Sequence, residues 1–288
     1  GPGWTHSYHV FLTNTGPSVL VTFGDGHVEA YFPATGGGYL AEPSVFNTLA
    51  KIGDEWLLTD RRQTILRFDG NGRLQSITDR NDNRLSLHYS GPDLDRIVDT
   101  AGREVRLIVE GGRISQLIDP ANRTNRFTYG PSRDLIEAID PTNQTNTYSY
   151  NAAHQINDAF DGRGIRYVHN EYLDGIVARQ HDAYTNWTWF AFDFTNRVTL
   201  QTNALGGVSR YEFDHRLLTT NVVDEAGHTN SFAYDEDLNR VVVVDKNRNM
   251  TRFGYGRRGN LTNQVDALGG ETHFAYDDRN DLIWQRDV

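Results

Sequence analysis

The ten histidines are the first candidates for a chemical role, because imidazole can hold a metal ion or carry a proton near neutral pH. Metal-binding histidines on one element often stand at a short fixed spacing such as HxxxH, and no such pair occurs. We therefore predict histidines scattered over the surface or half-buried, with no metal site. Six of them lie in the second half at unrelated positions: His154, His169, His181, His215, His228 and His273.

The 38 aspartate and glutamate residues could supply the carboxylate pair of a glycoside hydrolase, but no pair stands out. Glu55 and Asp60 flank Trp56 as in a sugar site, yet an ordinary turn explains Asp60 better. No serine stands in a GxSxG motif. The absence of cysteine excludes a thiolate zinc site and a cysteine nucleophile. We predict no catalytic, cofactor-binding or metal-binding residue, no cofactor, and no enzymatic activity.

The aspartates nevertheless recur in a regular series across residues 119–287. Their positions differ by 21 or 42 residues, and Asn203 fills the one gap. Calcium-binding β-rolls have a nine-residue period, so this period predicts turn capping by the side-chain oxygens instead of a calcium site. The series consists of Asp119, Asp140, Asp161, Asp182, Asp224, Asp245, Asp266 and Asp287.

Counting each aspartate as position 0, aromatic residues recur at positions 8 and 10. Residues two apart face the same side of a strand, whereas in a helix they would lie about 200° apart. Each copy therefore predicts one β-hairpin, for example with strands at Thr229–Tyr234 and Arg240–Val244. Position 8 holds Phe127, Tyr148, His169, Phe190, Tyr211, Phe232, Phe253 and Phe274, and position 10 holds Tyr129, Tyr150, Glu171, Phe192, Phe213, Tyr234, Tyr255 and Tyr276.

Eight such hairpins would form about 16 strands, a sheet roughly 75 Å wide. Strongly twisted open sheets seldom exceed about ten strands without curling. The predicted fold is thus all-β: tandem 21-residue hairpins in a curled, spiralling antiparallel sheet, part of a hollow β-shell. The position 8 and 10 aromatics are interpreted as core or lumen lining, with a sugar-stacking ladder as the alternative.

The first third of the chain is less regular. Gly24-Asp25-Gly26 separates two alternating runs, Val19–Phe23 and His27–Phe32, which predicts a hairpin turn; it is not a phosphate loop, because no helix follows. Residues 1–78 are predicted as irregular hairpins leading into the array of residues 79–288. We expect one unbroken sheet from about residue 4, forming a single unit.

Two neighbouring copies depart from the pattern. The copy from Asp161 has His169 and Glu171 at the aromatic positions and Tyr172 one residue later, which predicts a one-residue slip or bulge. In the next copy Trp187 and Trp189 alternate with the aromatic residues at positions 8 and 10. Both faces of that strand are therefore aromatic, which indicates a contact on each side.

Composition limits the partners. The formal net charge is −10, whereas nucleic-acid-binding proteins are usually basic, so we predict no nucleic-acid partner. No run of 18 apolar residues occurs, so no membrane span is predicted.

The chain lacks an initiator methionine and stops one residue past a repeat boundary, so we expect it to be a fragment of a longer protein.

The pattern resembles the Rhs or YD-repeat family, which takes its name from a recurring Tyr-Asp pair. Tyr234-Asp235 and Tyr276-Asp277 are such pairs, Phe192-Asp193 and Phe213-Asp214 are variants, and the run at 229–241 is similar to the family consensus. The resemblance implies repeats wound into a hollow β-shell. In bacteria such shells hold a C-terminal toxin, and in animals the teneurins carry a related shell at the cell surface.

From this resemblance we expect a non-enzymatic shell segment, secreted or at the cell surface. Its expected partners are the remaining repeats and a C-terminal toxin or effector domain of the same polypeptide, and a glycan or cell-surface partner is possible. The resemblance does not imply self-cleavage of this chain, because the carboxylate-bearing segment that cuts the chain in bacterial Rhs proteins is absent. Two alternatives stay open: a carbohydrate- or cell-surface-binding repeat module, and a β-propeller glycosidase or lyase with about 42 residues per blade.

Overall fold

The computed structural model describes residues 3–288, and within this range all regular structure is β-strand. Within each unit the paired strands are antiparallel and consecutive in the chain, so the all-β hairpin fold is confirmed. The chain divides into two compact units, one comprising Gly1–Asn143 with Asp278–Asn280 and the other Gln144–Asp277 with Asp281–Val288.

The first unit begins with a separate four-stranded sheet, whose strands pair in chain order. The turn at Gly24–Gly26 joins its second and third strands, with Phe23 N–H donating to the His27 carbonyl, as predicted for a hairpin. The expectation of one unbroken sheet from residue 4 is therefore wrong. The strands are β1 (Phe11–Asn14), β2 (Val19–Thr22), β3 (Val28–Pro33) and β4 (Tyr39–Ala41).

The repeat hairpins of the first unit begin after this sheet. Their strands are β5 (Thr48–Ile52), β6 (Glu55–Thr59), β7 (Ile65–Phe68), β8 (Leu74–Thr78), β9 (Arg84–Ser90), β10 (Asp93–Val98), β11 (Glu104–Glu110), β12 (Arg113–Ile118), β13 (Thr124–Tyr129) and β14 (Leu135–Ile139).

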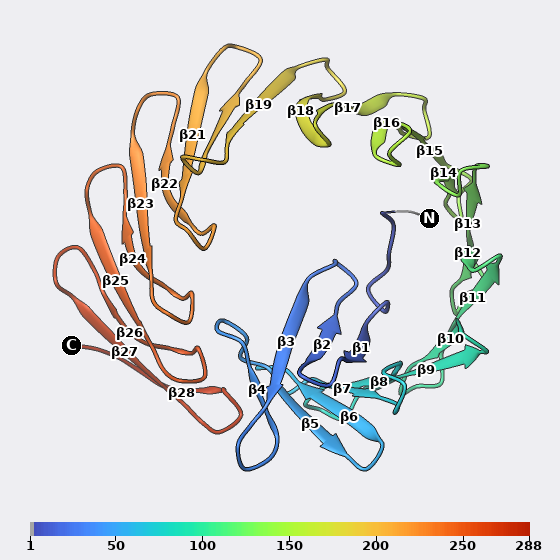
Figure 1. The fold of residues 1–288 in the computed structure, drawn as a ribbon, viewed down its shortest axis with the longest axis horizontal. Helices are drawn as coiled ribbons and strands as arrows, with labels where there is room; N and C mark the ends of the chain where they lie inside the picture. Colours follow the sequence, from blue (N-terminus) through green and yellow to red (C-terminus); the bar gives the residue numbers. More distant parts are fainter. Residues whose placement is uncertain (1–2) are drawn as a thin grey trace. The chain divides into compact units, whose positions relative to one another are not determined.

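The hydrophobic core of the first unit joins the two sheets. Val21 and Tyr31 from the four-stranded sheet and Trp56, Phe68 and Leu74 from the hairpins belong to one buried cluster, and β1–β3 lie beside β5–β8 in Figure 1. This packing explains the break after β4. The alternating apolar residues on β2 and β3 bury more apolar surface when they cover the face of β5–β8 than they would if their strands extended the edge of that sheet.

The second unit is a run of hairpins joined strand to strand without interruption (Figure 1, green to red). A β-propeller would break into blades of about four strands, so the propeller alternative is wrong. Thr229–Tyr234 and Arg240–Val244 are strands as predicted. The strands are β15 (Thr145–Tyr150), β16 (Ile156–Phe160), β17 (Arg166–Leu173), β18 (Ile176–His181), β19 (Trp187–Asp193), β20 (Val198–Thr202), β21 (Val208–Phe213), β22 (Thr219–Val223), β23 (Thr229–Tyr234), β24 (Arg240–Val244), β25 (Met250–Tyr255), β26 (Leu261–Val265), β27 (Glu271–Tyr276) and β28 (Leu282–Asp287).

The repeated aspartates cap the turns, as predicted, except Asp287, which ends β28 and accepts a hydrogen bond from the Thr272 hydroxyl. Asp245 Oδ1 accepts the backbone N–H groups of Asn247 and Asn249, each at 2.8 Å. Asn203 makes the same two contacts with Leu205 and Gly207 at 3.0 and 2.8 Å, so an amide oxygen can replace the carboxylate. The fourth residue of these turns has positive φ even where it is not glycine, as at Thr185, Leu217 and Arg248.

We expect the chain to lose stability as the pH falls below about 4. The pKa of Asp245 is lowered by hydrogen bonds from the Asn249 side chain and then from its backbone N–H. Side-chain hydrogen bonds likewise lower the pKa of Asp79 and Asp182. A lowered folded-state pKa adds stability above the unfolded-state value, and this stability is lost as the pH falls through the folded-state value. Urea unfolding at pH values from about 7 to 3 measures the effect.

Asp245→Asn is the matched variant, because Asn203 shows that asparagine preserves the turn. It should unfold at a similar urea concentration at neutral pH and lose less stability on acidification. A denaturation midpoint that stays constant between about pH 5 and 3 would contradict the role of the aspartates.

Tyrosine hydroxyl groups fasten successive hairpins to one another. Tyr129 donates to the Ile114 carbonyl at 2.8 Å, and Tyr234 donates to the Thr219 carbonyl at 2.9 Å; the two partners lie 15 residues apart in each case. Tyr89 and Tyr255 make the same contact with Leu74 and Arg240. In these four copies the tyrosine at position 10 thus joins its hairpin to the second strand of the preceding copy.

Tyr129→Phe should lower the free energy of unfolding by about 0.5–1.5 kcal/mol, because it removes one such hydrogen bond without changing the ring. Tyr184→Phe is the control, since Tyr184 is 84% exposed on a turn. Burial also raises the pKa of Tyr129. Its contribution is therefore complete below the unfolded-state value of about 10 and is lost at higher pH. Urea titrations at neutral and alkaline pH test both points, and equal losses in the two variants would exclude the contact.

Candidate functional site

An extra bulge in β17 produces a side-chain cluster that is found in no other copy within residues 3–288. The β16–β17 ladder shifts register between Ala159 and Phe160, whereas the corresponding β20–β21, β22–β23 and β24–β25 ladders do not shift. A one-residue slip turns side chains to the other face of a sheet. The slip predicted for this copy is thus confirmed. Tyr172 replaces the position 10 tyrosine and donates to the Ile156 carbonyl at 2.7 Å.

The slip turns His169 toward Asp158 and His181, which are its direct partners on the neighbouring strands. His169 Nδ1 lies 2.7 Å from Asp158 Oδ1, and its ring stacks on that of His181 at a centroid distance of 5.0 Å. Trp187 meets the buried His181 edge to face at 4.8 Å, and the Arg179 guanidinium lies 4.5 Å from the Trp187 ring centre. We call these five residues the histidine–tryptophan cluster.

Two carboxylates in or beside the histidine–tryptophan cluster, Asp158 and Glu171, each pair with an arginine. Burial acts to raise the pKa of Asp158, but hydrogen bonds from His169, Ser149 and Arg166 outweigh it, and the pKa is lowered. The pKa of Glu171 is lowered mainly by its hydrogen bond from Arg179. Both carboxylates therefore remain ionised near neutral pH, and each faces an arginine.

Ser149, Asp158 and His169 are not arranged as a catalytic triad. Ser149 Oγ donates to Asp158 at 2.8 Å, and Asp158 in turn contacts His169. A Ser-His-Asp triad needs the imidazole between the hydroxyl and the carboxylate, so that it can accept the hydroxyl proton. Residues 3–288 also contain no group of three or more His, Asp or Glu side chains that could hold a metal ion.

The other face of β19–β21 is neutral and aromatic. Strand register places Phe190 opposite Gln201, and Phe192 opposite Thr199. On β21, Ser209 and Tyr211 continue these two rows. We call this surface, which also includes Thr188, Phe194 and Phe213, the neutral aromatic face. β19 is therefore aromatic on both faces, as the sequence predicted.

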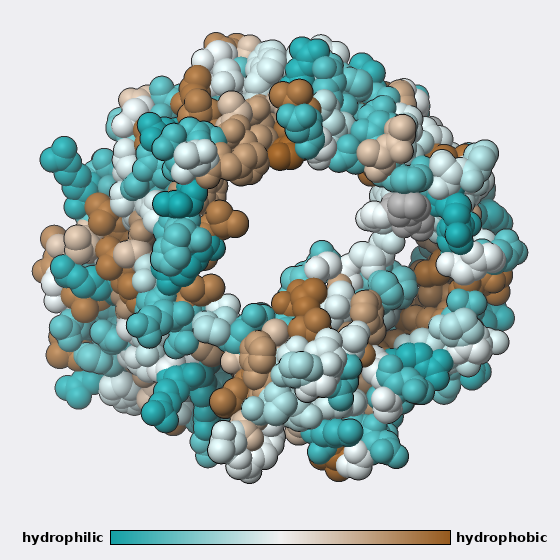
Figure 2. All heavy atoms as spheres, viewed as in Figure 1, coloured by the Kyte–Doolittle hydropathy of each residue, from teal (hydrophilic) through white to brown (hydrophobic). Residues whose placement is uncertain are grey.

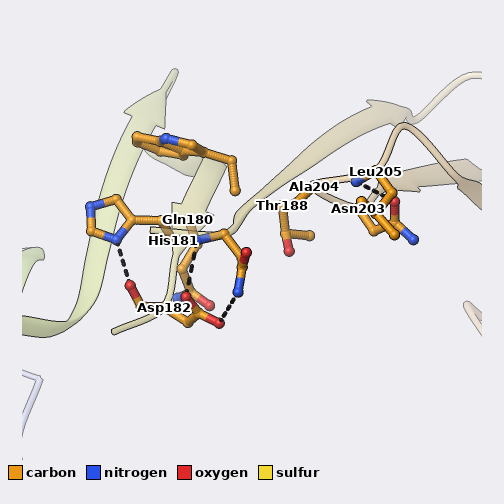
Figure 3. A pocket seen from close by; sticks show the side chains of 9 residues that line it. Gln180, His181, Asp182, Thr188, Asn203, Ala204 and Leu205 are labelled. Atoms are coloured by element: carbon orange, nitrogen blue, oxygen red, sulfur yellow. Dashed lines mark hydrogen bonds between the residues drawn. The ribbon is translucent and has the colours of Figure 1, made fainter. Parts of the chain in front are cut away.

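A recess of about 440 Å³ lies between two neighbouring turns at one end of these strands. Figure 3 shows Thr188 between the Asp182 turn and the Asn203 turn, with Gln180 on the neighbouring strand. Asp182 already accepts a hydrogen bond from Asn186 at 3.0 Å. Leu205 stands almost fully exposed beside the recess, at 96%.

The residues weighed from sequence as a sugar site lie elsewhere and have structural roles. Trp56 is only 2% exposed and belongs to the core of the first unit. Asp60 caps a turn through the N–H groups of Arg62 and Thr64, as the turn interpretation predicted. The pairing of His169 with His181 was missed because the two stand at different repeat positions. The displaced Tyr172 was the available signal.

Comparisons with known proteins identify the fold. No family model matches the chain, and no curated protein matches its sequence. Solved structures do match: TcdB2-TccC3 has a TM-score of 0.54 at 13% identity, over 92% of this chain and 20% of that chain. TcdB2-TccC3 without its hypervariable C-terminal region has a TM-score of 0.53 at 9% identity, over 96% of this chain and 20% of that chain.

The Photorhabdus luminescens Tc holotoxin pore matches with a TM-score of 0.52 at 14% identity, over 92% of this chain and 16% of that chain. The chain thus spans about a fifth of the length of the structures that it matches. None of residues 3–288 forms a helix that could cross a membrane. The likeness covers nearly all of this chain, and the chain therefore has the fold of Rhs/YD-repeat shell proteins.

Proposed function

We propose that this chain is a non-enzymatic wall segment of a secreted or cell-surface Rhs/YD-repeat protein, which encloses or presents a C-terminal effector domain of the same polypeptide. The fold supports a shell-like repeat protein. The matched structures are components of toxin complexes, which is consistent with an effector as the partner.

The observation that carries the proposal is the lack of a core in the second unit. Among the strand residues of β15–β28, only Ala159 and His181 are buried. Compact domains bury one face of each sheet against a second layer. Here both faces of a 14-strand run remain half-exposed, and Figure 2 shows hydrophilic and hydrophobic residues mixed over the visible surface. Such a single layer is typical of a wall that separates two spaces.

Limited proteolysis of the natural full-length polypeptide tests the proposal. With the wall folded, the effector region should resist protease. It should become sensitive when the first unit is unfolded by a core variant such as Trp56→Ala. The isolated effector region, supplied separately with this chain, serves as the control for intrinsic resistance. Equal digestion of the effector region in the wild-type and variant polypeptides would contradict enclosure.

A further inference from the structure

His181 stands at a repeat position that is hydrophobic in other copies. Position 20, counted from each aspartate, holds Ile139, Phe160, Val223, Val244 or Val265 elsewhere. His181 is only 3% exposed. Histidine is the side chain whose charge changes between about pH 5 and 8. A titratable ring therefore replaces a hydrophobic side chain at one point of the array.

The contacts of His181 fit a neutral ring. A carbonyl oxygen can only accept a hydrogen bond, so the Nδ1–H of His181 donates to the Asp182 carbonyl, at 2.8 Å (Figure 3). Within residues 3–288, His181 Nε2 has no hydrogen-bond partner. A protonated imidazole carries an N–H group on both nitrogens. The N–H at Nε2 would therefore need water as its acceptor, and water has little access to so buried a side chain.

The charged groups around the stacked histidines are balanced while both rings are neutral. Asp158 pairs with Arg166 at 3.1 Å. Glu171 pairs with Arg179 at 2.7 Å, and the lowered pKa of both carboxylates keeps them ionised in mild acid. The exposed Asp182 carboxylate accepts three N–H groups within its own turn. In the described part of β16–β19, no further carboxylate faces the two rings to neutralise an added proton.

His169 has acceptors for an added proton, whereas His181 has none. His169 Nδ1 lies 2.7 Å from Asp158 Oδ1, and its Nε2 lies 3.7 Å from Glu171 Oε1. A proton on His181 as well would place two positive rings at a centroid distance of 5.0 Å. Arg179, two residues before His181, adds a third positive charge on the same face of β18. Like charges so close repel, so the second proton favours separation of these groups.

Trp187 stands between His181 and the solvent-filled recess. The two rings meet edge to face at 4.8 Å, and both residues line the recess of about 440 Å³ (Figure 3). Only three residue pairs join β18 to β19, and the pair nearest the Asp182 turn is His181 with Trp187. Displacement of Trp187 into the recess would admit water to His181 Nε2 and unpair this end of the two strands.

We propose that the histidine–tryptophan cluster is a pH-sensitive switch, in which a proton taken up by His181 displaces Trp187 and opens the end of β18–β19 at the Asp182 turn. The open state binds this proton and the closed state does not. Closure is therefore favoured above the ordinary titration range of imidazole, near pH 6.5, and is lost as the pH falls through it. One proton makes opening at most about tenfold more favourable per pH unit.

Hydrogen exchange of the whole chain at about pH 7.5, 6.5 and 5.5, measured by mass spectrometry and corrected for the intrinsic rate at each pH, tests the switch. Peptides from β18–β19 should lose protection by about threefold to tenfold between pH 6.5 and 5.5. Peptides from β24–β25 are the internal control, because three residue pairs also join these strands at the Asp245 turn and neither strand contains a histidine. Equal changes in the two pairs of strands would overturn the proposal, and so would constant protection of β18–β19.

His181→Val gives this copy the side chain that Val244 supplies at the same position. It should fold as the other copies do and remove the response of β18–β19 to pH. His228→Asn is the control, because Asn249 likewise donates to the aspartate of its turn; this variant should respond as the wild type does. A response that persists in His181→Val, or an equal loss in His228→Asn, would overturn the assignment.

His169→Gln tests the repulsion between the two rings separately. Glutamine can donate to Asp158 but cannot become charged. The response of β18–β19 should therefore fall below about threefold between pH 6.5 and 5.5. An undiminished response would contradict a switch made of two stacked rings. All of these measurements read the chain itself, so they do not depend on enclosure of an effector.

Discussion

Trp56→Ala should lower the free energy of unfolding of the first unit by about 3–5 kcal/mol, the usual loss when a buried tryptophan is truncated. Trp56 is 2% exposed, packs on Tyr39 at a centroid distance of 5.3 Å and lies beneath Lys51. It joins the four-stranded sheet to the repeat hairpins. Its removal leaves a cavity that neither sheet can close alone.

Hydrogen exchange measured by mass spectrometry resolves this loss by region. Peptides from β5–β8 should exchange faster in Trp56→Ala, and peptides from β21–β24 should change less. Trp189→Ala is the matched control, because Trp189 is 40% exposed and lies outside the core; its cost should be below about 1 kcal/mol. Equal destabilisation by the two substitutions would show that the core is not concentrated in the first unit.

Gly72→Ala should be the most damaging glycine substitution in the chain. Gly72 has φ of +81°, and a Cβ atom there would lie 1.8 Å from the Leu12 carbonyl oxygen. The same glycine accepts a hydrogen bond from Leu12 N–H at 2.8 Å, so β1 rests directly on this turn. The new methyl group would force β1 away from the β7–β8 turn and open the edge of the core.

Gly206→Ala separates the backbone strain of a residue with positive φ from the steric clash with β1. Gly206 has φ of +84°, and no atom lies within 4 Å of its ideal Cβ position, so its substitution measures backbone strain alone. That strain should cost about 1–2 kcal/mol, and Gly72→Ala should cost clearly more. Urea unfolding of both variants gives the comparison. Equal losses would mean that β1 can move aside freely.

The sequence was sufficient to predict the hairpin array, because both of its determinants are local. Turn-capping side chains and alternating aromatics act within about 20 residues, and they placed strands such as Thr229–Tyr234 correctly. The separate sheet of β1–β4 was not predictable in this way. Its strands alternate as any half-buried strand does, and nothing local tells whether such a strand extends one sheet or covers another.

The candidate sites show the same limit. The displaced Tyr172 predicted the slip in β17, but the meeting of His169 with His181 depends on cross-strand register, which the spacing of histidines does not reveal. The neutral aromatic face was predictable in part, because aromatic residues on both faces of Trp187–Asp193 indicated a contact on each side. The absence of charge on the neighbouring strands became apparent only when β20 and β21 were aligned with it.

The tyrosine contacts have a consequence for how the chain is made. Each hydroxyl group reaches back 15 residues, to a strand that has already been synthesised. Nascent chains emerge from the ribosome at about 5–20 residues per second, whereas a hairpin forms in about 1–10 microseconds. A new hairpin can therefore be fastened long before its successor appears. We expect the structure to grow from its first unit in the direction of translation, with one exposed edge at a time.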